Sequence, residues 1–135
     1  ASWPKPASEW KNNAISLRFE KLLSARNEIN RSLEKLRAEG VIGKSLQARV
    51  TVHSSDTELQ SILRSTDLCE IFIVSEATIS DGPIGDESPQ LKGFTVKAEK
   101  SLHAKCDRCW NQRSDVGRSA AHPTLCGRCA QVIGT

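Results

Sequence analysis

Two Cys-x2-Cys pairs near the end of this chain constrain its fold more than any other feature. Cys106 and Cys109 form the first pair, and Cys126 and Cys129 form the second after 16 intervening residues. This spacing is typical of a four-thiolate zinc site, where each short turn presents two sulfurs to one tetrahedral ion. Four protein ligands leave no open position, so we expect a structural zinc. Two disulfides or four unrelated thiols are the alternatives.

The number and spacing of the cysteines indicate the cellular compartment of the protein. Five cysteines, four of them in metal spacing, favour a reducing cytoplasm over an oxidising compartment. Cys69 lies in the apolar run 68–74, and we predict a buried, inert thiol there. No run approaches the roughly 18 apolar residues of a transmembrane helix, so no membrane partner is expected. The sequence starts at Ala1 and contains no Met, as in a processed protein or a fragment of a longer protein; of these two we expect the fragment.

Charge is distributed unevenly along the chain. From Lys92 onward there are eight Lys and Arg against three acidic residues, whereas residues 1–91 hold eleven against thirteen. The positive charge is therefore concentrated in the cysteine-rich end. This favours a polyanionic partner there, although a solvated basic face would have the same composition.

The first third of the chain has the periodicity of a long helix. Ser8 is a plausible N-cap, and Gly40 follows the last periodic residues. About thirty helical residues would make a rod of roughly 45 Å, too long to be covered by the remaining chain, so we expect part of it to pack on helices outside this chain. The apolar stripe comprises Ile15, Phe19, Leu22, Arg26, Ile29, Leu33 and Leu36.

The middle of the chain alternates between strand and helix patterns. We predict strands at 46–53, 68–74 and 94–98, a short helix opened by the capping-box residues 55–58, and a polar loop over 81–89. The predicted fold class is α+β, with a long N-terminal helix, a small α/β layer of about three strands with one helix, and a C-terminal four-cysteine zinc-finger module.

These patterns predict three domains, at residues 1–45, 46–101 and 102–135. The catalytic motifs that can be read from sequence are absent: there is no Gly-x-Gly-x-x-Gly, no P-loop and no Gly-x-Ser-x-Gly. We expect His53 to be a solvated surface residue. His103 or His122 could replace a cysteine as zinc ligand, but four cysteines are already in register. We therefore predict no catalytic site within this chain.

The residues around the cysteines offer recognition chemistry. Trp110 directly follows a cysteine, and a tryptophan held on a rigid metal turn can stack on an unpaired base. Covering the zinc core is the equally weighted alternative for this ring. Guanidinium groups suit phosphates and guanine edges. Those near Trp110 in the sequence belong to Arg108, Arg113, Arg118 and Arg128.

Together these segments resemble the C-terminal zinc-binding part of bacterial-type isoleucyl-tRNA synthetases. The resemblance covers about residues 8–133 and includes the last helix of the anticodon-binding region. It is carried by the following motifs: Lys105-Cys106-Asp107-Arg108-Cys109-Trp110, Asp115-Val116-Gly117, Leu125-Cys126-Gly127-Arg128-Cys129, Arg26-Asn27-Glu28-Ile29-Asn30, Gly43-Lys44-Ser45-Leu46 and Leu91-Lys92-Gly93-Phe94.

The resemblance implies a tRNA-binding module of a large ligase. The anticodon arm of isoleucine tRNA and the remainder of the parent synthetase would be its partners. ATP would bind only in the absent catalytic domain, since the class signatures His-Ile-Gly-His and Lys-Met-Ser-Lys-Ser are missing. It assigns zinc to the four cysteines and anticodon contact to Arg108 and Trp110; Arg113 and Arg118 are weaker candidates, because no family motif aligns there. The competing hypothesis is a stand-alone, zinc-stabilised protein–protein interaction domain derived from such a module.

Overall fold

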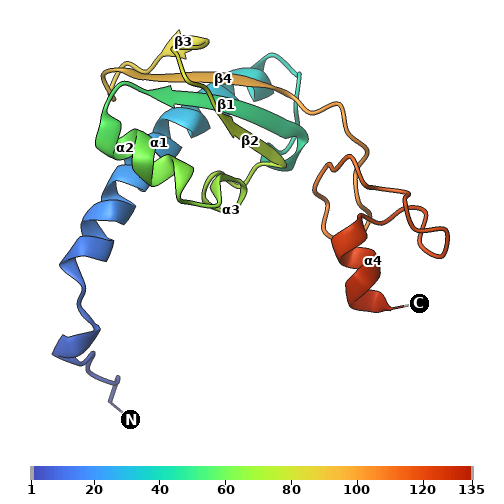
Figure 1. Cartoon of the computed structure of the whole chain (residues 1–135), viewed down its shortest axis with the longest axis horizontal. Coiled ribbons are helices and arrows are strands. Elements are labelled where there is room, and N and C mark those ends of the chain that lie inside the picture. Colours follow the sequence, from blue (N-terminus) through green and yellow to red (C-terminus); the bar gives the residue numbers. More distant parts are fainter. Residues whose placement is uncertain (1, 135) are drawn as a thin grey trace.

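In the computed structural model, which describes residues 2–134, a long helix leads into a four-stranded sheet and then into a cysteine-rich end (Figure 1). The predicted α+β class is confirmed. The elements in chain order are η1 (Ser8–Trp10), α1 (Asn13–Ala38), η2 (Ser45–Gln47), β1 (Ala48–Ser54), α2 (Thr57–Arg64), α3 (Leu68–Phe72), β2 (Glu76–Ile79), β3 (Asp86–Glu87), β4 (Phe94–Lys100) and α4 (Gly127–Ile133).

Helix α1 begins later than the sequence pattern predicted. The side chain of Asn12 accepts a hydrogen bond from the backbone N–H of Ile15 and is the N-cap. Ser8 lies in the separate 3-10 turn η1, so its prediction as N-cap was wrong. At the other end, Gly40 adopts a φ of 71°, a left-handed conformation that glycine adopts without steric cost and that commonly follows a helix.

Helix α1 contributes buried residues only from Leu22 onward. Leu22, Ile29 and Leu33 are each at most 1% exposed and share one core with the sheet. In the first turns, which extend away from the sheet in Figure 1, Ile15 and Phe19 remain 54% and 44% exposed. The predicted stripe therefore packs on this chain over part of its length only.

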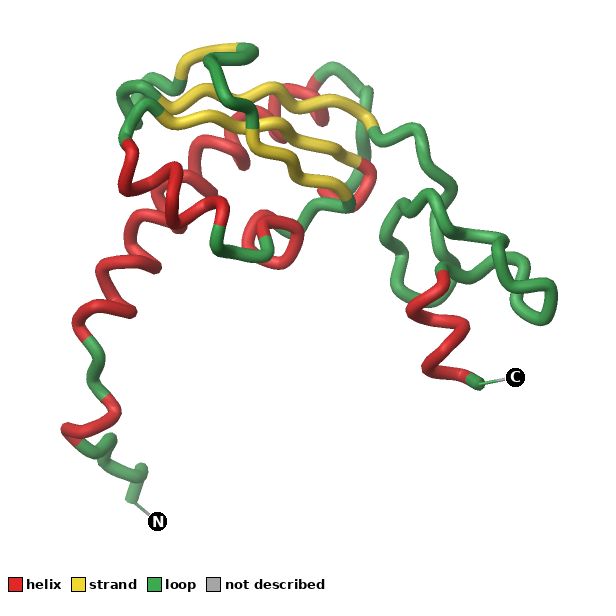
Figure 2. Tube along the Cα trace, viewed as in Figure 1, coloured by secondary structure: helices red, strands yellow, loops and turns green. Residues whose placement is uncertain are grey.

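The sheet, whose strands are yellow in Figure 2, has the order β2-β1-β4-β3 and is mixed. Strand β1 pairs in parallel with β2 and antiparallel with β4. Residues of β1 alternate between buried and half-buried, as expected for a sheet covered by helices on one face. Ala48, Val50 and Val52 of β1 pack in the same core as residues of α1, α2 and α3. There is thus one helical layer against one sheet.

The prediction of a strand at 68–74 was wrong. Asp67 accepts hydrogen bonds from the backbone N–H groups of Cys69 and Glu70 and starts the short helix α3 instead. Leu68 and Phe72, four residues apart, are then buried together on one side of the helix. Ile73 ends α3 with a φ of 55°, and the strand follows as β2. A local cap outweighed the β-branched composition of the run.

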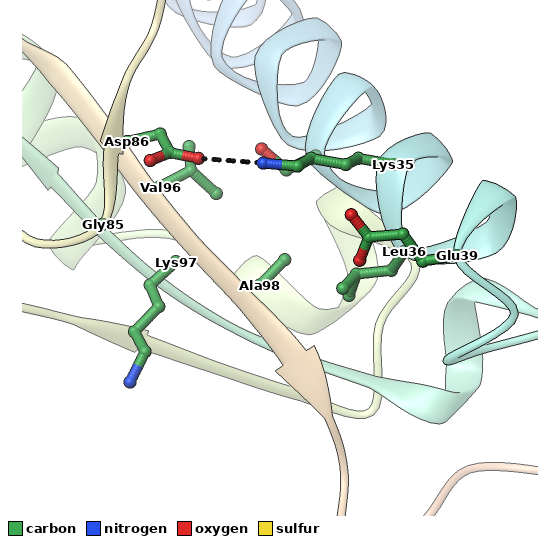
Figure 3. A pocket seen from close by; sticks show the side chains of 9 residues that line it. Lys35, Leu36, Glu39, Gly85, Asp86, Val96, Lys97 and Ala98 are labelled. Atoms are coloured by element: carbon green, nitrogen blue, oxygen red, sulfur yellow. Dashed lines mark ion pairs between the residues drawn. The ribbon is translucent and has the colours of Figure 1, made fainter.

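The predicted polar loop contains the short edge strand β3, which gives the sheet its fourth strand. Lys35 of α1 extends over the sheet edge toward Asp86 of β3, with 3.6 Å between Nζ and a carboxylate oxygen (Figure 3). Gly85 lies so close to the backbone of Val96 that a Cβ there would be 2.3 Å from the carbonyl oxygen. The ion pair joins the loop to α1, and the absence of a side chain at Gly85 lets the loop lie close to β4. Across residues 2–134, no helix is both long and apolar enough to traverse a bilayer.

Candidate metal centre and nucleic-acid surface

The four cysteines of the two Cys-x2-Cys pairs lie close together in space. Their Sγ atoms all lie within 4.8 Å of one another, and those of Cys109 and Cys126 are 3.8 Å apart. A tetrahedral ion with zinc–sulfur bonds of about 2.3 Å requires sulfurs about 3.8 Å apart. A disulfide requires about 2.05 Å, and all five cysteines are free thiols. The spacing argument is confirmed in its geometry. Among residues 2–134, this is the one group of such ligands close enough to hold a metal.

Tight backbone turns present the sulfurs. The N–H of Cys106 donates to the carbonyl of Asn111, and the N–H of Trp110 donates to the carbonyl of Cys106, both over 2.9 Å. Cys126 precedes the first turn of α4, and its backbone N–H donates to Sγ of Cys106 over 3.4 Å. Asp115 fixes that helix start by accepting the N–H of Gly127 over 3.0 Å.

Burial and backbone dipoles act in opposite directions on these thiols. Burial opposes ionisation of Cys106, but the N–H groups of Cys109, Cys126 and Arg108 outweigh it and lower its pKa to about 6. Burial, with the neighbouring thiols, raises the pKa of Cys126 to about 12. Four thiolates this close therefore require a cation to coexist.

The donor set suits structural Zn²⁺, the cofactor predicted from the sequence. Four sulfurs leave no position for water or substrate. The apolar packing around the cysteines is small: Val116 and Leu125 are the aliphatic side chains of residues 2–134 that pack on them. In small modules of this kind the metal supplies much of the folding free energy. His103 and His122 lie outside the cluster, since their imidazoles contact Glu76 and the carbonyl of Gly134 respectively.

Trp110 is placed on the outside of the first zinc turn. Its φ of 64° is in the left-handed region, where a bulky residue is strained, and its side chain is 51% exposed. The Nζ atoms of Lys44 and Lys105 lie 4.6 Å and 5.1 Å from the ring centroid. Neither lysine was among the predicted site residues. Lys105 directly precedes the first ligand, a position that could have signalled it, whereas the sequence gives no sign that Lys44 comes close.

The four arginine and tryptophan candidates do not form one group. The guanidinium of Arg108 faces the metal centre, with Nη1 3.8 Å from Sγ of Cys129. Arg113 and Arg118 instead line a hollow of about 590 Å³ between the sheet and the cysteine-rich end. That hollow is lined by acidic residues as well, Asp67, Glu76 and Asp115. It is therefore less suited to a polyanion than the surface around Trp110.

His53 does not follow the expectation of a solvated residue. It is half-buried, and its Nδ1 lies 3.2 Å from the carbonyl oxygen of Ser80. The contact ties β1 to the residue after β2.

Comparison with known proteins gives a consistent result. Residues 105–132 match the family described as the zinc finger found in FPG and IleRS. Isoleucine–tRNA ligases of Shewanella amazonensis and Syntrophotalea carbinolica are 42% and 39% identical to this chain over 85% and 93% of its length. That of Desulfitobacterium hafniense is 35% identical over 96%. The chain spans only 13–15% of the length of these relatives.

Proposed function

We propose, from the homology of this chain to isoleucine–tRNA ligases over most of its length, that it is the tRNA-binding C-terminal module of such an enzyme. The module recognises the anticodon arm of isoleucine tRNA, and the zinc holds the recognising residues in place. ATP-dependent attachment of isoleucine takes place in the rest of the parent enzyme. The cytoplasm is the proposed location, which agrees with five free thiols.

The structural observation that supports anticodon recognition is the strained, half-exposed Trp110 on the first zinc turn. Glycine would occupy this left-handed position without strain. A tryptophan there costs on the order of 1–3 kcal/mol, and such strain persists where it serves a site. An exposed ring on a rigid support is suited to stacking on an unpaired base of a loop.

The charges near the ring favour an RNA partner. Lys44 and Lys105 adjoin Trp110, and Arg108 lies between the first two zinc ligands. We propose Arg108 and Trp110 as the main anticodon contacts. Arg113 and Arg118 are proposed as peripheral contacts, because the hollow they line also contains carboxylates.

The remainder of the synthetase is the second proposed partner. Ile15, Phe19 and Leu23 occupy neighbouring turns of α1 and are each 44–54% exposed. The relatives contain far more chain than this segment, which supplies a partner for that apolar face.

We propose the predicted domains 1–45, 46–101 and 102–135 as the module boundaries. The boundary near residue 101 is supported by the end of β4 at Lys100 and by the separate apolar cluster of the cysteines. The boundary at 45 has weaker support. The first turns of α1 lie outside the core of the sheet, but Leu22, Ile29 and Leu33 of the same helix belong to that core.

Binding of the zinc-loaded chain to a fluorescently labelled isoleucine tRNA transcript tests the function. The reference ligand is the same transcript with a changed anticodon. We expect tighter binding to the natural anticodon and a weakening by about 1–3 kcal/mol with Trp110→Ala. Binding that ignores the anticodon would refute anticodon recognition. If the chain binds no tRNA at all, the stand-alone protein-interaction domain is favoured. The apolar face of α1 would then be its interacting surface.

A further inference from the structure

Lys44 and Trp110 come from different parts of the fold. Lys44 precedes η2, in the connection from α1 to the sheet, whereas Trp110 lies on the first zinc turn. The ammonium of Lys44 is nevertheless 4.6 Å from the centroid of the ring, within the range of a cation–π contact. Lys105 approaches the same ring to 5.1 Å.

Neither ammonium is neutralised by a carboxylate of the described residues. The lysines that form ion pairs within residues 2–134 are Lys21, Lys35 and Lys97, and neither Lys44 nor Lys105 is among them. Both distances are measured to one centroid, so the two ammonium groups are within about 10 Å of each other, where like charges repel. Two ammonium groups therefore approach the ring, and neither forms an ion pair within residues 2–134.

An ammonium and a base cannot occupy the same face of the indole together. A nucleotide, however, brings a base for the ring and a phosphate for the ammonium. The four-carbon stem of lysine is flexible enough to exchange one for the other.

We propose that Lys44 covers the ring of Trp110 in the free protein and moves to a phosphate of single-stranded RNA when a base stacks on that ring. This inference rests on the proposed function and assigns Lys44, outside the zinc module, to the RNA site. It also implies that RNA bridges the connection from α1 to the sheet and the zinc module, since one partner of the contact comes from each. The ammonium of Lys105, which also lies over this ring, adds positive charge to the site.

The first experiment tests the cover in the free protein. Trp3 and Trp10 are highly exposed, so Trp3→Phe and Trp10→Phe leave Trp110 as the sole tryptophan of the chain. In this zinc-loaded background, Lys44→Ala should increase quenching of Trp110 fluorescence by acrylamide. Lys92→Ala, which removes an exposed lysine elsewhere, should leave it unchanged. Equal quenching in both variants would refute the cover.

The second experiment tests the phosphate contact with the labelled isoleucine tRNA transcript. Lys44→Ala should weaken binding about fivefold more than Lys92→Ala and lower the log–log salt slope by about one, whereas Lys44→Arg should retain both. If Trp110→Ala weakens binding and Lys44→Ala matches Lys92→Ala, this inference fails alone. If the wild-type chain binds no tRNA, the proposed function fails, and the phosphate contact fails with it.

Discussion

Ser75 joins the sheet to the zinc module through Gln112. Its hydroxyl accepts the backbone N–H of Gln112 over 2.7 Å and donates to the carbonyl of Leu46 over 2.5 Å. Ser75 lies directly before β2, and Gln112 is almost fully buried in the strand-like turn that pairs with Lys105. One side chain therefore connects two segments that are distant in sequence.

Replacing this hydroxyl should loosen the junction. Ser75→Ala leaves the N–H of Gln112 and the carbonyl of Leu46 without their partner, which should cost about 1–3 kcal/mol of unfolding free energy. Chemical denaturation with zinc in excess measures this loss, and amide exchange at Gln112 should accelerate. Ser114→Ala, at an exposed position, is the matched control and should change neither quantity. A Ser75→Ala protein with the stability of that control would contradict the role of Ser75.

Zinc removal should unfold one end of the chain only. The cysteine cluster has few apolar contacts of its own, whereas the sheet has a separate core. We expect a strong chelator to abolish the dispersed NMR signals of residues beyond about Leu102 and to leave those of β1 in place. Loss of the signals of β1 as well would contradict the proposed boundary near residue 101.

Two substitutions of Trp110 separate backbone strain from side-chain function. Glycine tolerates the left-handed φ of this position, whereas alanine does not. The free energy of unfolding of Trp110→Gly should therefore be about 1 kcal/mol higher than that of Trp110→Ala, so the glycine variant is the more stable. Both variants lack the ring and should bind isoleucine tRNA equally weakly. Denaturation with excess zinc measures the first quantity and fluorescence anisotropy the second. Equal stability of the two variants would show that the turn relaxes around a side chain.

Cys69 should make stability depend on alkaline pH. Burial, aided by the carboxylate of Asp67, raises the pKa of its thiol in the folded protein. The stabilisation is therefore complete below the unfolded-state pKa of about 8.5 and is lost as pH rises through the folded-state value. Between pH 7 and 10, melting temperatures of the wild-type protein should fall more than those of Cys69→Ala. The zinc ligands are common to both proteins, so parallel curves would show that Cys69 is not the source.

The features that were predictable depend on short-range patterns. The zinc site was predictable from the spacing of the four cysteines, and β1 and β4 were predictable from their alternating apolar residues. Helix α3 was missed because the apolar run 68–74 is too short for its periodicity to distinguish a helix from a strand. The deciding interaction is the helix cap formed by Asp67. Strand β3 has two residues and exists only through its pairing with β4.

The surroundings of Trp110 could be predicted only in part. Arg108 was predicted from its place between two zinc ligands, and the place of Lys105 directly before the first ligand could have signalled that residue. Lys44 reaches the ring through the packing of the α1–β1 connection against the zinc module, which no local pattern encodes. The same reason explains the separation of Arg113 and Arg118 from Trp110, since the turn after Gln112 directs the chain into the hollow beside Glu76.

The strand order also determines when the sheet can form during synthesis. Strand β4 is last in sequence but lies between β1 and β3, and seven residue pairs join it to β1 across the middle of the sheet. Until Lys100 has left the ribosome, β1 lacks one of its two neighbours and the core of Val50 and Val52 remains open. The first Cys-x2-Cys pair, Cys106 and Cys109, is synthesised only a few residues later. The second pair, Cys126 and Cys129, follows 26 and 29 residues after Lys100, so the four-thiolate site can be completed only after every strand of the sheet has been synthesised.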